Sequence, residues 1–200
     1  SEWLIAARSQ KTIALESSPH IARDYIHVDD VVRALALLPT EVVFVVFGVG
    51  PDEAKLRALL AELKLESRVQ LRGQIGHDVM PKYLKACDIF IRPSRSEGVG
   101  NSFVEAMAAE LPVIATQEGG IADFLFDQQL NPDRETTGFA VRKDNPEDIA
   151  SSVRKIMANP VFVTQVVVTA KAMALREYDW NLVAERMERE VFIPVLERVL

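Results

Sequence analysis

Short apolar runs and amphipathic segments alternate along most of the chain. The apolar runs are rich in β-branched or aromatic side chains and are bounded by turn residues, a pattern that predicts β-strands. They are WLIAA (3–7), VVFVVFG (42–48), RVQLRG (68–73), DIFIRP (88–93), PVIAT (112–116) and, after a polar excursion, FAV (139–141). Apart from 68–73, these runs are almost continuously apolar, as expected for a parallel sheet that is covered on both faces.

The segments between these runs carry apolar residues at helical spacing and are therefore predicted to be helices. They are 28–38, 50–63, 77–87, 101–110, 146–159 and a helical tail over 160–200, with breaks expected at 178–181 and at Pro194. Asp29 or Asp30 is the expected N-cap of the first helix, and Asn101 or Ser102 is that of the fourth, because short polar side chains accept hydrogen bonds from the first helical amides.

Strands that alternate with helices over short connections predict right-handed crossovers and an α/β, Rossmann-like doubly wound sheet with helices on both faces. We expect one domain over residues 1–200. Such sheets bind ligands beyond the carboxyl ends of their strands. The loops expected at that edge are 8–28, 48–51, 73–77, 93–101 and 116–120.

Composition narrows the possible classes of protein. Two hundred residues, 48% of them hydrophobic, suffice for one sizeable core, and no apolar stretch is long enough to predict a transmembrane segment. No signal peptide is recognised, and the single cysteine, Cys87, is expected to be a small buried hydrophobe in a reducing cytoplasm. A net charge of −6 with scattered Lys and Arg argues against a nucleic-acid partner.

The candidate chemistry lies between 92 and 107, in RPSRSEGVGNSFVEAM. Gly98 and Gly100 allow the backbone to approach a ligand, and the helix that follows offers free amides to an anion such as phosphate. Glu105 stands within an apolar helical stretch, and Glu97 lies in the turn before it. Two interpretations are open: a solvated Glu97 with a buried Glu105 paired to a lysine, or two carboxylates that face one ligand and accept hydrogen bonds from its hydroxyls.

These residues also carry a resemblance. EGVGNSFVE holds two glutamates separated by seven residues after a Pro-Ser-x-Ser strand end, and EAMAAELPVIAT and EGGIADFL follow. Together with FGVGPDEAKLRALL and MPKYLKACDIFIRPS, this pattern resembles the donor-binding, C-terminal half of the retaining GT-B glycosyltransferases of family 4 (glycosyl transferases group 1). The resemblance runs from about Val42 to Tyr178, and the segment YDWNLVAERM extends it.

The resemblance implies a role for each matched residue. Glu97 would be the catalytic residue that touches the transferred sugar and stabilises its developing positive charge, and Glu105 would accept hydrogen bonds from the ribose of the nucleotide. The other donor-binding residues would be Arg8 and Lys11 at the phosphates, the backbone of Gly98, Val99, Gly100, Asn101 and Ser102 at the sugar and diphosphate, and Gly73 near the base. Gly119 is either a turn residue or a further contact with the donor. The resemblance implies a UDP- or GDP-linked sugar as substrate and no cofactor or metal, since basic residues would neutralise the leaving diphosphate.

The chain departs from the family pattern in three places. The segment TIALESSPHIARDYIHVDD is longer than its counterpart, so Arg23 competes with Lys11 for the phosphate role. Part of it, RDYIHVDDVVRAL, also resembles nucleotide-sugar epimerases, although neither a GxxGxxG loop nor a Tyr-xxx-Lys pair is present. Lys64 and Glu110 occupy two helix ends where the family favours glycine, which predicts either a loss of stability of about 1 kcal/mol at each or a locally different helix end.

A complete enzyme of this family has two halves, and this chain matches only one. We therefore expect it to work with an N-terminal, acceptor-binding domain of the same enzyme, on which the tail 160–200 would pack. Without that half, the apolar face of the tail is expected to be exposed and to favour self-association. We expect the full enzyme to lie in the cytoplasm, either free or attached to the periphery of the membrane. The alternative function is a nucleotide-binding or interaction module without catalysis of its own.

Overall fold

The computed structural model describes residues 12–15, 28–98 and 100–199, and its described strands form one parallel sheet. The strand order is β3-β2-β1-β4-β5-β6, the order of a doubly wound α/β sheet. The strands are β1 (Thr12–Leu15), β2 (Val43–Phe47), β3 (Val69–Gly73), β4 (Ile89–Arg92), β5 (Val113–Ala115) and β6 (Phe139–Ala140). The predicted fold class is therefore confirmed.

The first strand differs from its prediction. Residues 3–7, the expected strand, lie outside the described residues, whereas Thr12–Leu15 form β1 between β2 and β4. The prediction of a loop over 8–28 is thus wrong at these four positions. TIAL is short and less hydrophobic than WLIAA, but a β-branched pair at its start suits a central parallel strand, where Ile13 pairs with both Phe44 and Ile89.

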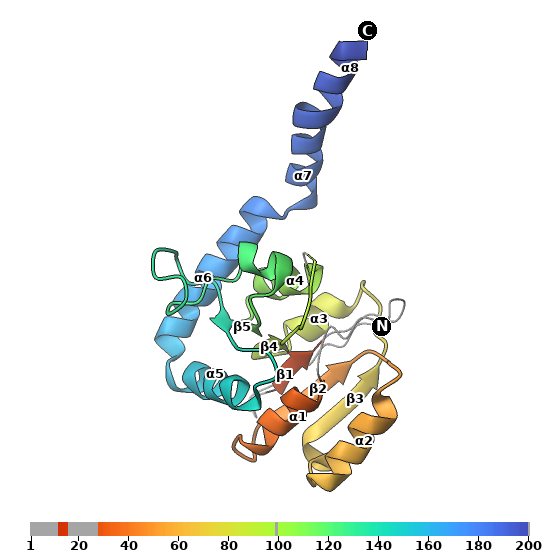
Figure 1. Cartoon of the computed structure of the whole chain (residues 1–200), viewed down its shortest axis with the longest axis vertical. Coiled ribbons are helices and arrows are strands. Elements are labelled where there is room, and N and C mark those ends of the chain that lie inside the picture. The colour runs from red at the N-terminus through yellow and green to blue at the C-terminus, as the bar shows by residue number, and fades with distance from the viewer. Residues whose placement is uncertain (1–11, 16–27, 99, 200) are drawn as a thin grey trace.

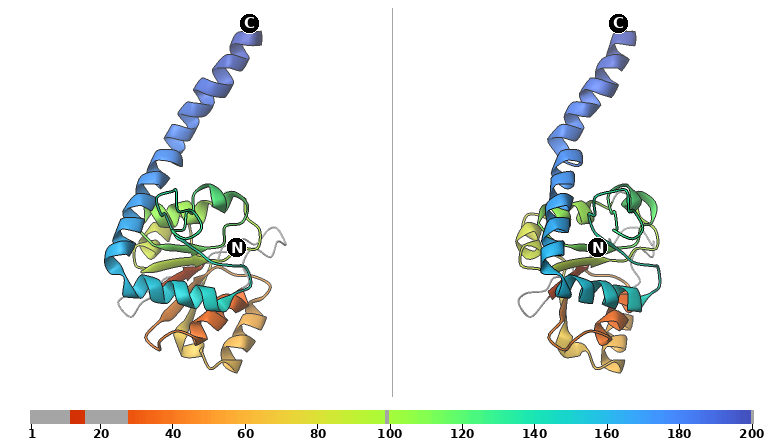
Figure 2. Two further views of the ribbon diagram at one scale, coloured as in Figure 1. Left: turned by 60° about the vertical axis from the view of Figure 1, so that its left-hand side comes forward. Right: turned by 90° about the vertical axis from the view of Figure 1, so that its left-hand side faces the viewer.

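Helices cover both faces of the sheet. They are α1 (Val28–Ala36), α2 (Glu53–Glu62), α3 (Met80–Leu84), α4 (Asn101–Ala108), α5 (Pro146–Ala158), α6 (Pro160–Glu177), α7 (Trp180–Met187) and α8 (Ile193–Val199), with short 3-10 turns η1 (Glu66–Arg68) and η2 (Gly119–Asp123) and a π-helix, η3 (Glu188–Phe192). Figures 1 and 2 show α1, α2 and α5 on one face and α3 and α4 on the other.

A line of aromatic rings ties the site-bearing half of the sheet together. Phe103 of α4 packs edge-on against Phe90 of β4 and contacts Phe124, which follows η2, and Phe124 in turn meets Tyr178 at the end of α6. The three phenylalanines are fully buried. Because one line of contacts joins β4, α4 and the end of α6, the turn between β4 and α4 rests on a well-packed base.

Two predicted N-caps are corrected. The helix α1 begins at Val28, so Asp29 and Asp30 lie in its first turn, where a carboxylate still interacts favourably with the helix dipole. The N-cap of α4 is Gly100, in a left-handed conformation (φ 63°), and Asn101 and Ser102 are helical. A Cβ at Gly100 would lie 2.6 Å from the ring of Phe103, so the space admits only glycine.

The two helix ends that lack the family's glycine keep the conformation that glycine would adopt. Lys64 and Glu110 both have positive φ, 56° and 68°. At each end the amide of the next residue bonds back across the last turn, from Leu65 to Leu60 and from Leu111 to Ala106, which is the Schellman arrangement. Of the two alternatives, a strained left-handed end or a locally different helix end, the structure shows the left-handed end at both positions. Glu110 also forms an ion pair with Lys171 of α6.

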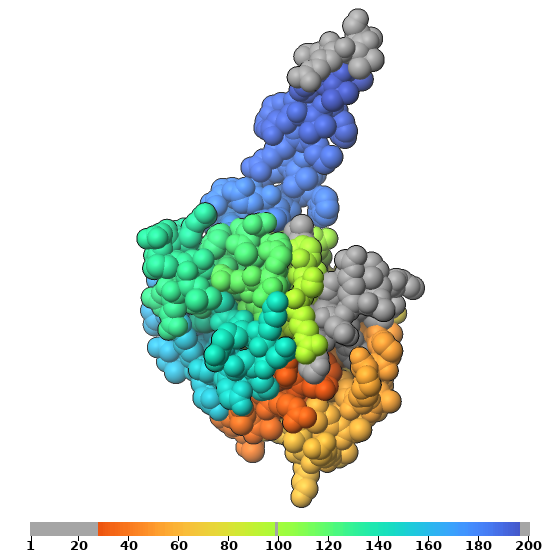
Figure 3. All heavy atoms as spheres, viewed as in Figure 1, coloured from red at the N-terminus to blue at the C-terminus, as the bar shows by residue number. Residues whose placement is uncertain are grey.

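The C-terminal tail leaves the body of the molecule after α6. This helix packs on α4 and buries Val166, Ala170, Met173 and Ala174. The chain breaks at Tyr178–Asp179, as predicted, and no residue from Trp180 to Leu196 is buried. Figures 2 and 3 show this segment standing clear of the body.

The break expected at Pro194 is replaced by a change of helix type. The π-helix η3 precedes Pro194, and the helix continues as α8. A π-turn can absorb the hydrogen bond that proline cannot make. Among the described residues, no individual helix is long and apolar enough to cross a membrane. Residues 146–158 and 160–196 meet the required length and hydropathy only when they are taken together, and these two helices are bent by 104° relative to each other.

Candidate functional site

The turn between β4 and α4 places the candidate residues at the carboxyl edge of the sheet. The strand β4 is buried along its whole length and ends at Arg92, after which the chain turns through Pro93–Gly100 into α4. The neighbouring strand β5 ends nearby and leads to Gly119. The carboxyl ends of two adjacent parallel strands thus present their loops side by side, where ligands bind in this fold class.

Glu97 is held by a buried arginine. Its carboxylate Oε2 lies 2.8 Å from Nη2 of Arg92, and the two side chains are only 10% and 7% exposed. Arg92 Nη1 donates to Ser102 Oγ at 2.6 Å, and the guanidinium lies 5.1 Å from the ring centre of Phe103. Arg92 was not among the predicted site residues, although a charged residue at the end of the apolar run IFI is a signal that could have identified it.

Unsatisfied polar atoms gather in the same turn. Among the described residues, three buried side-chain atoms make no hydrogen bond: Arg92 Nε, Ser94 Oγ and Glu97 Oε2. Glu97 Oε2 is close enough to Arg92 for an ion pair, but the two groups are not aligned as a hydrogen bond. Buried polar atoms are nearly always satisfied in folded proteins, so this concentration within 92–97 sets the turn apart as a place with spare bonding capacity.

Some of the backbone amides around the glycine turn, which were expected to be free for a ligand, already donate hydrogen bonds within the protein. Gly98 N donates to Glu97 Oε1 at 3.2 Å, and Phe103 N donates to Gly100 O at 3.0 Å. Asn101 is exposed at the start of α4, whereas Ser102 is buried and its hydroxyl is engaged by Arg92. Val99 lies outside the described residues. The amides at 99–103 were expected to be free, and the prediction is wrong for Phe103, whose amide is committed to the helix cap.

Gly119 touches the backbone of Glu97. It has a left-handed φ of 57°, and a Cβ at this position would lie 2.0 Å from the carbonyl oxygen of Glu97. The absence of a side chain therefore lets the β5 loop pack directly on the β4 loop. The structure brings Gly119 together with Glu97, and this contact is a packing reason for glycine at position 119.

Glu105 is exposed on α4, which corrects the idea that it needs a buried partner. The buried positions of this helix are Ser102, Phe103, Ala106 and Met107, so Glu105 falls on its outer side. The carboxylate already takes part in a polar or electrostatic interaction. It remains accessible to a ligand at the cost of exchanging that interaction, and no dedicated internal partner is needed to explain its charge.

The remaining predicted residues are distributed differently. Gly73 ends β3, three strands away from β4 in the sheet, and its carbonyl accepts from Gly48 N at 2.6 Å. It has φ 69° with open space where a Cβ would stand. Arg8 and Lys11 lie outside the described residues.

A pocket of about 580 Å³ lies elsewhere, at the β6 edge of the sheet, and we refer to it as the edge pocket. None of the predicted donor-site residues that the structure describes lines it. Its lining residues are Gln117, Glu118, Asp127, Gln129, Leu130, Phe139, Ala140, Val141, Arg142, Lys143, Asp148, Ser151, Ser152 and Lys155. Four of the charged side chains in its wall form ion pairs, Lys143 with Glu118 at 2.8 Å and Arg142 with Asp148 at 2.6 Å. Asp127 accepts hydrogen bonds from the amides of Gln129 and Ala140.

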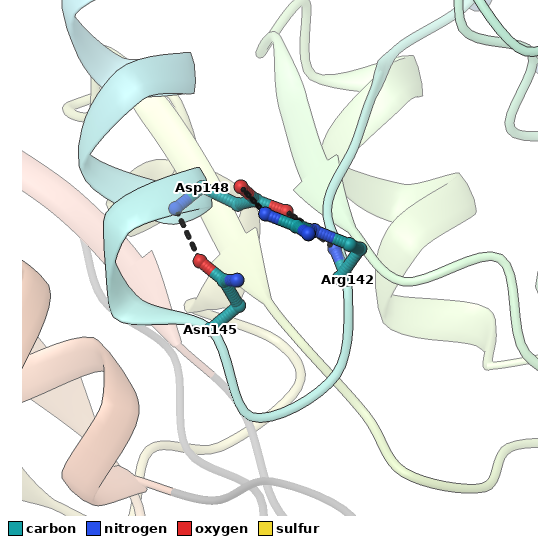
Figure 4. A network of polar contacts seen from close by, with 3 residues as sticks. All are labelled: Arg142, Asn145 and Asp148. Atoms are coloured by element: carbon teal, nitrogen blue, oxygen red, sulfur yellow. Dashed lines mark hydrogen bonds and ion pairs between the residues drawn. The ribbon is translucent and has the colours of Figure 1, made fainter.

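The Arg142–Asp148 pair adjoins the cap of α5 (Figure 4). Asn145 Oδ1 accepts from Asp148 N at 2.8 Å, which is the N-cap bond of the helix. The hydrogen bond from the Arg142 guanidinium lowers the pKa of Asp148 below its ordinary value, although partial burial acts in the opposite direction. These contacts are accounted for by helix capping and ion pairing, so the edge pocket is a weaker candidate than the β4–α4 turn.

The described fold and turn define a doubly wound α/β domain with a glycine-capped, carboxylate-bearing turn at the carboxyl edge of its sheet. A family model, glycosyl transferases group 1, matches residues 20–177. The chain therefore belongs to the glycosyl transferases group 1 family, and its fold is that of the Rossmann-like C-terminal domain of GT-B enzymes.

Among curated proteins, the chain is 30% identical over 134 residues to 2-deoxystreptamine glucosyltransferase of Streptomyces kanamyceticus, covering 67% of this chain and 33% of the relative. It is 30% identical over 146 residues to the phosphatidylinositol N-acetylglucosaminyltransferase gpi3 subunit of Schizosaccharomyces pombe, covering 73% and 30%. The chain spans about a third of the length of the curated relatives it matches.

Solved structures share the fold at lower identity. Anabaena Alr3699/HepE in complex with UDP-glucose matches with a TM-score of 0.75 and 21% identity over 86% of this chain and 47% of the other. The C-terminal domain of a glycosyl transferase group 1 family protein (LpcC) from Francisella tularensis matches with a TM-score of 0.66 and 19% identity over 82% and 84%. This likeness to an isolated C-terminal domain, over more than four fifths of both chains, supports the assignment of this fold to the C-terminal domain of such enzymes.

Proposed function

We propose that this chain is the donor-binding half of a retaining glycosyltransferase that transfers a sugar from a UDP-linked donor. The observation that carries the proposal is the β4–α4 turn, where Glu97, the glycine cap of α4 and Gly119 are packed together at the carboxyl edge. Family membership supports the reaction class. The related folds of Alr3699/HepE with UDP-glucose and of the pneumococcal O-GlcNAc transferase GtfA with UDP and GlcNAc support the uridine donor.

The diphosphate would bind at the start of α4. Asn101 and Ser102 are the first residues of this helix, and early helical amides lack a partner within their own helix. Their N–H groups and the positive end of the helix dipole favour a negatively charged group. Arg8 and Lys11 would complete the neutralisation of the leaving diphosphate, as electrostatic stabilisation of charge that develops in the transition state.

The two carboxylates would divide the donor between them. Glu97, next to Gly98 and Gly100, would act on the sugar and stabilise its developing positive charge. Glu105 is exposed on α4 and would accept hydrogen bonds from the ribose hydroxyls, a charge-assisted contact stronger than a neutral one. Gly73 would contribute to the side of the site that faces the base, and Gly119 to the side that faces the sugar.

Transfer would need the acceptor-binding half of the enzyme. The tail carries exposed apolar side chains, including Trp180 (74% exposed), Phe192 (53%) and Leu196 (60%). Exposed apolar side chains along one helical segment are typical of an interaction surface. We assign this surface to the N-terminal half, and self-association of the isolated chain would be the consequence of leaving it uncovered.

Calorimetric titration of the purified chain tests the proposal. UDP, GDP and ADP, each with and without glucose attached, would be titrated into the wild type, Glu105→Gln and Glu62→Gln. The control Glu62 is likewise an exposed helical glutamate, at the end of α2. We expect a uridine nucleotide to bind, and Glu105→Gln alone to weaken it by about 1.5–3 kcal/mol.

If no nucleotide binds at millimolar concentration, the donor-binding proposal is wrong for this chain. If UDP-glucose binds but no sugar is transferred when the acceptor half is supplied, the chain is a nucleotide-binding module, the alternative function raised by the sequence. A transfer assay in the presence of that half separates these two functions.

A further inference from the structure

The buried arginine at the end of β4 has no obvious place in a purely structural core. The other three residues of β4 are apolar, and an ion pair that is almost fully buried is often no more stabilising than well-packed apolar side chains of similar volume. Arg92 nevertheless contacts three groups on two segments: the carboxylate of Glu97, the hydroxyl of Ser102 and the ring of Phe103. The position of this buried guanidinium is therefore explained by the groups that it contacts, and not by the stability of the core.

The partner that needs the charge is Glu97. Its side chain is 10% exposed, and a carboxylate with so little contact with water requires a compensating positive group. The guanidinium is planar and carries its charge over two terminal nitrogens, so Arg92 can form the ion pair with Glu97 through Nη2 while Nη1 donates a hydrogen bond to Ser102. A lysine has one compact ammonium group and cannot reproduce this geometry.

We infer that Arg92 is a positioning residue of the donor site, which fixes the carboxylate of Glu97 relative to Ser102 at the start of α4. Glu97 stands on the sugar side of the proposed site and Ser102 on the diphosphate side, so Arg92 sets the spacing between the two halves of the donor. This inference rests on the proposed function. Arg92 itself lies beneath the turn and acts through Glu97 and Ser102.

The test measures UDP-glucose and UDP binding by calorimetry with Arg92→Met, Arg92→Lys, Glu97→Gln and the double variant Arg92→Met/Glu97→Gln. We expect Arg92→Met to weaken UDP-glucose binding at least tenfold and Arg92→Lys at least threefold. The double variant should bind within twofold of the weaker single variant, because the two residues act as one unit. UDP, which lacks the sugar, should be affected less than UDP-glucose.

Arg68→Met is the matched control. Arg68 is also a partly buried arginine, and it donates to the backbone carbonyls of Leu38, Pro39 and Val42, away from the site. Its loss should lower stability and leave the UDP-glucose affinity of the folded protein within twofold of wild type. If Arg92→Met does not fold, Arg92→Lys tests the positioning role, because it keeps the positive charge and removes the two terminal guanidinium nitrogens that contact Glu97 and Ser102.

Two results would overturn the inference: UDP-glucose affinity within twofold of wild type in Arg92→Met or Arg92→Lys, or effects of Arg92→Met and Glu97→Gln that multiply in the double variant. If the wild type bound neither UDP nor UDP-glucose, the proposed function would fail on its own. A urea-unfolding cycle of the same variants would then decide whether Arg92 holds Glu97. A coupling of at least fivefold in the unfolding constant supports it, and independent effects contradict it.

Discussion

Gly119 and Glu97 are in backbone contact: a Cβ added to Gly119 would lie 2.0 Å from the carbonyl oxygen of Glu97. The loops after β4 and β5 therefore meet without an intervening side chain. Since Glu97 is also tied to Arg92 from beneath, its position is set from two sides. The geometry of the proposed donor site depends on a glycine that need not touch the donor.

Replacing Gly119 by alanine should therefore displace the Glu97 turn. The added methyl group must push the backbone of Glu97 away, and we expect a loss of stability of about 2–4 kcal/mol from strain and overpacking together. Urea unfolding would measure the loss, and UDP-glucose binding by the folded fraction should weaken at least tenfold.

Gly73→Ala separates the clash from the backbone strain. Gly73 has a similar left-handed φ (69°, against 57° at Gly119), but no atom of the described residues, its chain neighbours aside, lies within 4 Å of its added Cβ. Its substitution should cost only the strain, about 1–2 kcal/mol. Equal losses of stability in the two variants would show that the contact between Gly119 and Glu97 does not constrain the turn.

Lys64→Gly should stabilise the protein. Lys64 holds a left-handed conformation (φ 56°) at the end of α2, and glycine adopts it without steric strain. After the larger conformational entropy of glycine in the unfolded chain is subtracted, we expect a gain of about 0.5–1 kcal/mol in the free energy of unfolding. Ala58→Gly, at an exposed position inside the same helix, should instead lose about 1 kcal/mol; a loss at both positions would contradict the account.

Removal of the tail after Asp179 should leave the domain intact. No residue from Trp180 to Leu196 is buried, so the free energy of unfolding should change by no more than about 0.5 kcal/mol. Sedimentation velocity should show less self-association, because the exposed apolar side chains are gone. By contrast, a chain that ends at Ala158 loses the buried residues of α6, including Val166 and Met173, and should not fold stably. Equal stability of the two truncated chains would refute this division.

The Arg142–Asp148 pair should make stability depend on pH in the acid range. The pKa of Asp148 is lowered in the folded protein, first of all by the hydrogen bond from Arg142, so the unfolded state binds this proton more readily. The contribution is present above the ordinary pKa of an aspartate and is lost as the pH falls below about 4. The stability difference between wild type and Arg142→Gln, from urea unfolding, should therefore shrink between pH 5 and pH 3. A difference that grows toward acid would have the wrong sign.

The sequence predicted what periodicity and local chemistry determine. Five of the described strands and their alternation with helices were predicted, because each depends on a short stretch of chain. The strand β1 was missed, since TIAL gains its stability from Val43–Val46 and Ile89–Phe90 on either side and not from its own hydrophobicity.

The site was predicted less completely than the fold. The EGVGN turn identified Glu97 and the glycine cap, but the apolar letters around Glu105 suggested burial, whereas the helix places its apolar neighbours on the opposite face. Arg92 was not predicted because its role in the site depends on contacts with Glu97 and Ser102, and these contacts form only when the turn folds back on the strand. Such contacts carry no periodic signal along the chain.

The proposal that the donor binds at the turn between β4 and α4 is tested most directly by locating UDP-glucose on the protein. UDP-glucose would be titrated into the ¹⁵N-labelled chain, and amide chemical shifts would be followed by NMR. We expect the largest chemical-shift changes at the amides of Gly98, Gly100–Ser102, Glu105 and Gly119. Largest changes instead around the edge pocket, at Arg142, Ser151 and Lys155, or no changes at saturating UDP-glucose, would contradict the assignment of the donor site to the turn between β4 and α4.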